Sequence, residues 1–310
     1  MIKFPEVCIY CDRKRSPSSE LTTEHIIPKA LGGYNTYPKA SCKICNYKTS
    51  AFEAKVLRGA FYAFREKTNL TSRSKNRPIT LPLFAINGDE KSRLDIPIED
   101  YPAMLMLPKY FKAKILCDDG YDSEPCKPWL FTETHDLSKL TFKYGITSFA
   151  TMSIDSLSFG RMLCKIGHSW ACKYQLNRRF MPFLTRLIIE DRGHEFLNFV
   201  GISQITPPSI GLSHISHTIR LFEQSHKLGK LLVCEVTLFA NLGSPTYHIV
   251  VGLIPDSDNE AEFPKIMRIK IPKHHRITHF RAVVKIDGSV RRPAFDKFAP
   301  DVMGNFSNNR

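Results

Sequence analysis

The sequence predicts an α+β fold in which a small N-terminal domain, held together by cysteines, precedes a larger mixed α+β domain with an antiparallel sheet. Three observations carry this prediction. Two cysteine pairs with CxxC spacing lie thirty residues apart near the N-terminus. An amphipathic helical pattern occupies the middle of the chain, and segments rich in β-branched and aromatic residues, separated by glycine-containing turns, follow it.

Composition restricts the class of protein before any motif is considered. The chain has 310 residues, 43% of them hydrophobic, which is enough for two domains with a sizeable core. No apolar run reaches the roughly 18 residues that a membrane span needs, and the first residues lack the basic-then-apolar order of a signal peptide. We therefore expect a globular cytoplasmic protein with no membrane partner.

The charge of the chain is positive and unevenly distributed. The net charge is +14, which favours a polyanionic partner but is weak evidence by itself. From Met1 to Arg77 there are fifteen Lys or Arg residues against six Asp or Glu residues, so this quarter of the chain carries nine of the fourteen charges. The N-terminal end is therefore predicted to be the electropositive end.

The first domain is expected to cover residues 1–70. Turn residues break the chain into short segments up to about residue 48, and a helix is expected after that, with Thr49 or Ser50 capping its start. Its apolar residues recur at helical spacing: Ala51, Val56, Leu57, Phe61 and Phe64. A polar, basic stretch at 71–78 ends in proline and is predicted to be a linker.

The second domain is expected to cover residues 79–303, with a frayed tail at 304–310. Residues 81–149 predict short strands punctuated by prolines. An amphipathic helix is predicted over 154–174, capped by Ser153 or Ser156, and a short helix over 183–190. An antiparallel meander is predicted from three further segments, namely 217–222, 230–239 and 246–253.

The cysteines divide into two groups. Nine cysteines, an odd number, are an improbable disulfide framework in a cytoplasmic chain, because that compartment keeps thiols reduced. Cys8, Cys11, Cys42 and Cys45 form two CxxC pairs, each of which can hold one edge of a tetrahedral Zn²⁺. Four thiolates would close the coordination sphere, so the predicted zinc is structural. The remaining cysteines lack ligand spacing and are predicted to be packing residues: Cys117, Cys126, Cys164, Cys172 and Cys234.

A second motif lies between the two cysteine pairs. The segment 21–33 reads LTTEHIIPKALGG, and Asn46 follows Cys45 directly. This order of CxxC, acidic-His and CxxC-Asn resembles the HNH, or ββα-metal, endonucleases. It is most similar to their four-cysteine zinc branch, typified by phage recombination endonuclease VII. The resemblance covers about residues 8–55.

The resemblance implies roles for three residues. His25 would be the general base that takes a proton from the attacking water, and Glu24 would be a ligand of a catalytic cation. Asn46 would be a second ligand or would orient the site. Mg²⁺ or Mn²⁺ is the implied catalytic cation, because carboxylate and amide oxygens suit a hard ion. Without the resemblance, Glu24 and His25 could equally be a surface pair or core residues, and Asn46 could cap the helix.

The sequence departs from the family pattern at one place. Many HNH enzymes carry a further histidine on the helix, and this helix has none. Glu53 is the best substitute ligand, although an exposed helical glutamate is equally expected. Lys43, Lys48 and Lys55 are predicted to contact the phosphates of a nucleic acid.

The second domain carries no motif of known activity. Residues 159–171 and 238–252 resemble C-terminal segments of bacterial proteins of the HNH endonuclease family, for which no activity is implied. Lys165 and His168 lie one turn apart and could meet a phosphate or a base, but so apolar a helix more often buries its histidine. Trp129 and Trp170 could stack on a base, although aromatic residues at these spacings are usually part of a core.

The expected function is a metal-dependent endonuclease that hydrolyses double-stranded DNA and leaves 5′ phosphates. A role in restriction or phage defence follows only from analogy with the family. Two alternatives stay open: a zinc-dependent nucleic-acid-binding protein that does not cleave, and a nuclease that cleaves RNA. The second domain is expected to select the substrate or regulate cleavage.

Overall fold

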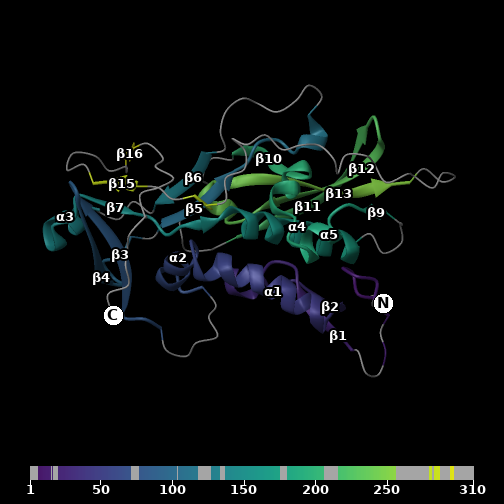
Figure 1. The fold of residues 1–310 in the computed structure, drawn as a ribbon, viewed down its shortest axis with the longest axis horizontal. Coiled ribbons are helices and arrows are strands. Elements are labelled where there is room, and N and C mark those ends of the chain that lie inside the picture. The colour runs from purple at the N-terminus through teal and green to yellow at the C-terminus, as the bar shows by residue number, and fades with distance from the viewer. Residues whose placement is uncertain are drawn as a thin grey trace.

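The computed structural model confirms the α+β class and its antiparallel sheets (Figure 1). It describes residues 6–14, 16, 20–70, 77–102, 104–117, 127–132, 137–174, 180–205, 216–255, 279–280, 283–286 and 294–296. Most of the predicted linker and the whole predicted tail lie outside these residues. None of the helices in the described part of the chain is long and apolar enough to cross a bilayer.

The N-terminal part is a β-hairpin followed by a helix. Strands β1 (Leu21–His25) and β2 (Thr36–Cys42) pair in antiparallel register, and helix α1 (Lys43–Arg58) begins directly after β2. A short helix, α2 (Tyr62–Lys67), follows. This hairpin–helix unit, residues 21–58, carries the acidic-His pair and Asn46.

Helix α1 begins earlier than predicted, and the capping prediction is wrong. Cys42, not Thr49 or Ser50, precedes the first helical residue, and the Thr49 hydroxyl donates a hydrogen bond to the Asn46 carbonyl inside the helix. The apolar pattern misses the first turn because Lys43 and Ile44 face solvent. A helix start that exposes its residues leaves no hydrophobic periodicity to read.

The region predicted to hold short strands forms a sheet and a separate hairpin. One sheet has the order β16-β15-β7-β3-β4 among the described residues. Its strands are β3 (Thr80–Asn87), β4 (Glu90–Pro97), β7 (Ser148–Ala150), β15 (Val283–Lys285) and β16 (Ala294–Asp296). The hairpin pairs β5 (Met104–Lys109) with β6 (Lys127–Thr132). Helix α3 (Ser138–Tyr144) was not predicted.

The two helices predicted in the second domain are present. They are α4 (Ser156–Tyr174) and α5 (Thr185–Ile189). The predicted cap of α4 is wrong, because Asp155 accepts hydrogen bonds from the backbone N–H and the hydroxyl of Ser158. Asp155 ends the short strand β8 (Ile154–Asp155), which pairs with β14 (His279–Phe280).

The predicted meander is confirmed and forms most of the largest sheet. Strands β11 (Thr218–His226), β12 (Gly229–Thr237) and β13 (Pro245–Ile254) pair in sequence order. Strand β10 (Val200–Ile205) pairs with the other edge of β13, and β9 (Met181–Pro182) also pairs with β13.

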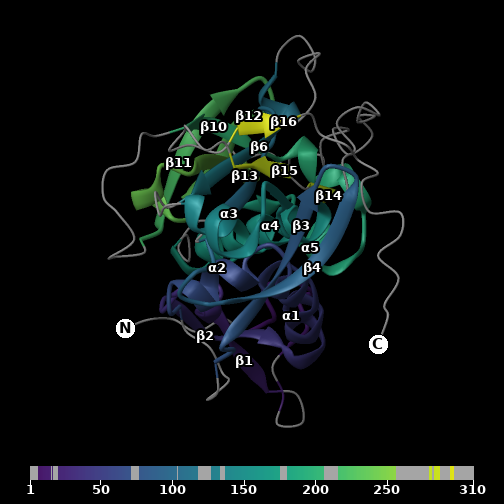
Figure 2. The same ribbon diagram turned by 90° about the vertical axis from the view of Figure 1, so that its left-hand side faces the viewer.

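The hairpin–helix unit, α4 and the largest sheet form successive layers. Helix α1 packs on α4, and α4 packs on β12 and β13, as both ribbon views show (Figures 1 and 2). Gly167 permits the close approach of α4 to the sheet, because a Cβ at this position would lie 2.8 Å from Ile249 Cγ2. Residues before the linker and residues after it share one hydrophobic core, including Phe52, Phe61 and Phe159.

Candidate metal centre and active site

The four cysteines of the CxxC pairs converge in space. Cys8 and Cys11 lie before β1, and Cys42 and Cys45 lie at the junction of β2 and α1. Their sulfur atoms all lie within 4.8 Å of one another, and Cys11 Sγ and Cys42 Sγ are 3.8 Å apart. Four Zn–S bonds of ~2.3 Å in a tetrahedron place the sulfurs about 3.8 Å apart. The residues therefore fit a zinc ion, as the sequence predicted.

Hydrogen bonds around Cys8, from a side chain and from the backbone, favour its thiolate, which is the form that binds metal. Its turn is closed by two hydrogen bonds, from Cys8 N–H to the Arg13 carbonyl and from Asp12 N–H to the Cys8 carbonyl. The backbone N–H of Cys42 donates to Cys8 Sγ over 3.3 Å. A hydrogen bond from the Cys45 thiol is the main cause that lowers the pKa of Cys8 to about 5.

The acidic-His pair lies at the end of β1, with its two side chains in different environments. Glu24 is buried, with 3% of its surface exposed, whereas His25 is half-buried. In the hairpin, Glu24 is opposite Tyr37 and His25 is opposite Thr36. Glu24 therefore enters the interior, whereas His25, the last residue of β1, stays partly accessible.

Asn46 lies inside α1, one residue after the cysteine ligand Cys45. It is half-buried, and its side-chain amide makes no hydrogen bond with the described part of the chain. The alternative that Asn46 caps the helix is wrong, because three helical residues precede it. Its amide oxygen is therefore available to a ligand, and the adjacent cysteine fixes its place in the helix.

A lysine of α4 enters the hairpin–helix unit and pairs with two carboxylates. Lys165 Nζ lies 2.7 Å from Glu24 Oε1 and 2.9 Å from Glu53 Oε1. The same ammonium donates hydrogen bonds to the backbone carbonyls of His25 and Ile26. Four oxygen atoms of the N-terminal unit thus surround one cationic group from the second domain.

The electrostatics of this cluster favour the charged form of Lys165. Burial alone would lower the pKa of Lys165, but the negative charges of Glu24 and Glu53 outweigh burial and raise it. Burial raises the pKa of Glu53, the charge of Lys165 opposes that rise, and the charge of Glu24 adds to it. The second carboxylate oxygen of Glu24, Oε2, is buried and has no hydrogen-bond partner among the residues that the structure describes.

These contacts determine which side chains are left to bind a catalytic divalent cation. Within the described residues, the four cysteines are the only His, Cys, Asp and Glu ligand atoms that cluster for a metal, so Glu24, His25 and Glu53 do not form a three-ligand set. Glu53, expected as either a ligand or an exposed residue, is engaged by Lys165 instead. Glu24 Oε2 and the Asn46 amide remain as oxygen donors of the kind a hard cation prefers.

Sequence reasoning singled out Lys165 but missed its partners. A phosphate or a base was only one possible partner beside burial in an apolar helix, and the structure brings carboxylates. The sequence did contain a sign of these partners, because Lys165 lies among Met162, Leu163 and Ile166, which are all fully buried. A lysine at such a site requires a counter-charge.

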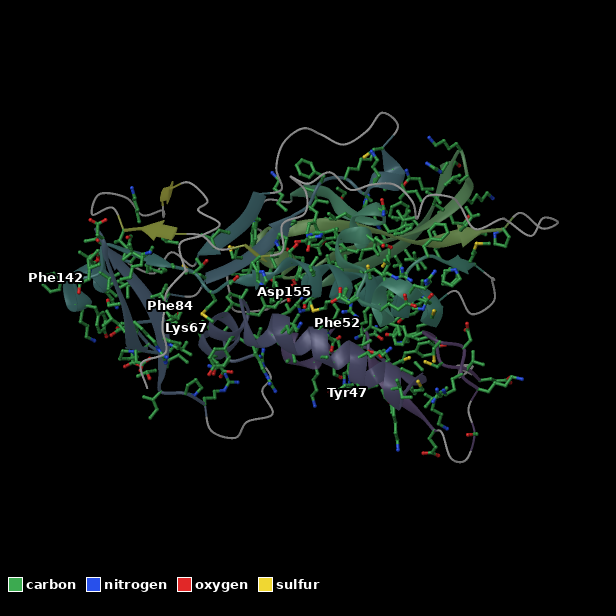
Figure 3. The ribbon with its side chains drawn as sticks, in the orientation of Figure 1. Tyr47, Phe52, Lys67, Phe84, Phe142 and Asp155 are labelled. Carbon is green, nitrogen blue, oxygen red and sulfur yellow. The ribbon has the colours of Figure 1, made fainter. Side chains whose placement is uncertain are left out.

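The three predicted nucleic-acid-binding lysines are exposed on α1. Lys43, Lys48 and Lys55 all face solvent, and the last two are seven residues apart and so share one side of the helix. Tyr47, beside Lys48, is 76% exposed and points away from α4, whereas Phe52 points toward it (Figure 3). The outer side of α1 is therefore basic and carries an exposed aromatic ring.

Polar side chains of the second domain hold the backbone around the metal centre. His168 Nε2 lies 2.6 Å from the Ile9 carbonyl, and Ser169 Oγ lies 3.3 Å from Tyr10 Oη. His217 Nε2 lies 2.7 Å from the Leu31 carbonyl. The predicted burial of His168 is confirmed, and the contacts of Ile9 and Tyr10 dock the first cysteine pair onto α4, whereas His217, just before β11, holds Leu31.

The tryptophans are partly buried. Trp170 is half-buried and its ring lies 4.3 Å, centroid to centroid, from Tyr174 at the end of α4. Trp129 is half-buried and packs against the main core.

One family model matches the N-terminal part of the chain. No curated protein and no solved structure matched this chain. The region that the family model matches contains the four cysteines, the acidic-His pair, Asn46 and Glu53. Such a match indicates a nuclease acting on nucleic acid. Residues 8–58 match the model of a family described as HNH endonuclease.

Proposed function

We propose that the protein is a metal-dependent HNH endonuclease that hydrolyses double-stranded DNA. The observation that favours it most is that one hairpin and the helix after it carry Glu24, His25 and Asn46. All three lie on a hairpin and helix whose junction carries Cys42 and Cys45. This arrangement fits the four-cysteine zinc branch typified by phage recombination endonuclease VII.

In this proposal the zinc has a structural role only. Four thiolates fill a tetrahedral coordination sphere and leave no position for substrate. The metal fixes the turn before β1 to the start of α1, so it holds the acidic-His pair and Asn46 in register. Zinc binding and folding of this unit are then coupled.

The chemistry is divided among three side chains. His25, half-buried at the end of β1, takes the proton from the attacking water on one ring nitrogen. Glu24 Oε2 and the Asn46 amide oxygen would hold Mg²⁺ or Mn²⁺. When bound, such a cation polarises the scissile phosphate and stabilises the leaving 3′ oxygen. Because Glu24 is buried, water does not compete with the cation for its carboxylate.

The exposed side of α1 is the proposed contact surface for DNA. Lys43, Lys48 and Lys55 supply positive charge for phosphates, and Tyr47 supplies a ring that can lie against a sugar or a base. Phosphate contacts do not read sequence, so selectivity is assigned to residues after the linker. A role in restriction or phage defence remains an analogy.

One observation favours a second candidate function. Lys165 already neutralises part of the charge of Glu24, as expected for a non-cleaving, zinc-dependent nucleic-acid clamp that needs no catalytic cation. The retention of His25 and Asn46 supports cleavage instead, because a clamp needs neither.

Incubation of the pure protein with plasmid DNA and with RNA, in Mg²⁺, Mn²⁺ or EDTA, separates these functions. Nicking or linearisation of the plasmid that stops in EDTA supports the proposal. Cleavage of RNA alone would replace the DNA assignment. Binding to both nucleic acids with no cleavage under any condition would favour the clamp.

A further inference from the structure

We infer that Lys165 is a positioning residue of the proposed nuclease site, contributed by the second domain. It holds one carboxylate oxygen of Glu24 and the backbone of His25, so that the other oxygen of Glu24 is presented to the catalytic cation. This inference rests on the proposed function. It adds to the HNH unit a residue that lies far outside the matched region 8–58.

Packing alone does not account for a lysine at this position. Lys165 is fully buried, and so are the apolar residues Met162, Leu163 and Ile166 near it on α4. Burial of an ammonium group costs several kcal/mol unless charges and hydrogen bonds compensate, and an apolar side chain would fill the same volume without that cost. The compensation comes entirely from oxygen atoms of the hairpin–helix unit.

The two oxygens of Glu24 have different environments. Oε1 lies 2.7 Å from Lys165 Nζ, whereas Oε2 is buried and no group in the described part of the chain forms a hydrogen bond with it. A buried, unpaired carboxylate oxygen is costly, which is explained if it is reserved for a ligand. Ligands of catalytic metals are commonly oriented in this way by a second residue that holds their other atom.

Lys165 also fixes the strand end that carries the proposed base. Its ammonium donates to the carbonyls of His25 and Ile26, the last residue of β1 and the one after it. These hydrogen bonds restrain the main chain of His25 relative to the carboxylate of Glu24. One side chain therefore sets the spacing between the base and the proposed metal ligand.

Glu53 keeps the cluster anionic. Glu24 and Glu53 carry two negative charges against one positive charge on Lys165. A divalent cation therefore still meets a net negative charge, although Lys165 is present. In this account Glu53 is the counter-charge of Lys165 and not a ligand of the metal.

A mere competitor for the metal would behave in the opposite way to a positioning residue. If Lys165 only occupied the place of the cation, its removal would expose two carboxylates and strengthen Mn²⁺ binding. If Lys165 positions Glu24, its removal weakens Mn²⁺ binding in spite of the added negative charge. The sign of the change in affinity thus decides between the two.

The test measures Mn²⁺ binding to the full-length, zinc-loaded protein by calorimetry, and DNA cleavage in parallel. Lys165→Met is expected to weaken Mn²⁺ binding by about 10- to 100-fold. It should lower kcat and leave KM for DNA nearly unchanged, because the DNA-contacting lysines lie on α1. Lys165→Arg, which keeps a charged donor, should recover part of both losses. Lys173→Met, on the same helix but in contact with Asn35 and the ring of Tyr174, should behave as wild type.

The double variant Lys165→Met/Glu53→Gln keeps the net charge of the cluster. It replaces Lys165→Met in this test if the single variant does not fold. It is expected to retain zinc and its circular dichroism spectrum and to bind Mn²⁺ as weakly as Lys165→Met. Unchanged or stronger Mn²⁺ binding in a folded variant overturns the inference, as does a wild type that binds no Mn²⁺. A wild type that binds Mn²⁺ and cuts no nucleic acid overturns the proposed function but not the comparison of affinities.

Discussion

Lys165 Nζ on α4 lies 2.7 Å from Glu24 Oε1 on β1, and this ion pair joins the two parts of the chain at the proposed nuclease site. The N-terminal unit is therefore completed, both in charge and in packing, by residues that follow the predicted linker.

A fragment that ends at Arg77 is expected to be poorly soluble and to have low thermal stability. It would expose apolar residues of α1 and α2, including Phe52 and Phe61, and would leave Glu24 and Glu53 without their cation. Removing one partner of a buried ion pair costs about 3–5 kcal/mol. Circular dichroism and light scattering of the fragment beside the full chain check this. A monomeric, cooperatively melting fragment would show that docking on α4 is dispensable.

Cys42→Ser is expected to lower zinc content well below the one ion per chain predicted for the wild type, and to lower the melting temperature. One lost thiolate opens the tetrahedral site, and metal binding is part of the folding free energy. Metal analysis after gel filtration measures this. Cys172→Ser is the control, since Cys172 lies near His168 and outside the cysteine cluster. Full zinc content and an unchanged melting curve in Cys42→Ser would contradict the four-cysteine site.

Reversal of Lys43, Lys48 and Lys55 to glutamate is expected to weaken DNA binding on all sequences alike. Each phosphate contact removed should reduce the slope of log affinity against log salt by roughly one. Fluorescence anisotropy between about 50 and 200 mM salt measures this slope. The control is the single variant Lys139→Glu, because Lys139 is exposed on α3. An unchanged slope in the triple variant would place the DNA contact elsewhere.

The stability of the protein is expected to fall as pH drops below about 6.5, in part through His217. Burial lowers the pKa of His217, and its Nδ1 accepts the backbone N–H of Phe239 while Nε2 bonds the Leu31 carbonyl. Below the unfolded pKa, the unfolded chain binds a proton that the native histidine resists, so stability is lost with acidification.

Denaturant unfolding of the wild type and of His217→Gln, at about pH 7.5 and about pH 5.5, isolates this contribution. Glutamine keeps a donor and an acceptor but does not titrate. The variant should lose less stability on acidification than the wild type, because its glutamine takes up no proton in the unfolded chain. The same loss in both proteins would exclude His217 as a source.

Sequence patterns predicted those features that depend on local spacing. The β11–β12–β13 meander and α4 follow from alternation and helical periodicity, and the cysteine cluster follows from its CxxC pairs. The start of α1 was missed because its first turn exposes Lys43 and Ile44 and thus shows no apolar period.

The charged cluster could not be predicted, because it depends on the packing of α4 against α1. Glu53 was expected to bind metal or to face solvent, and Lys165 to meet a phosphate, a base or the core. Each residue alone is compatible with those roles, and only the tertiary contact brings them within 2.9 Å. Long-range pairing of this kind leaves no periodic trace in a single sequence.

The rate of DNA cleavage by His25→Ala tests the central claim most directly. His25 is proposed to activate water and is not a zinc ligand, so zinc content, circular dichroism and DNA affinity should stay close to wild type. Loss of a general base should lower the cleavage rate by about 10²- to 10⁴-fold in Mg²⁺ or Mn²⁺. A folded His25→Ala protein that cuts at the wild-type rate would contradict the assignment of His25 and, with it, the HNH mechanism.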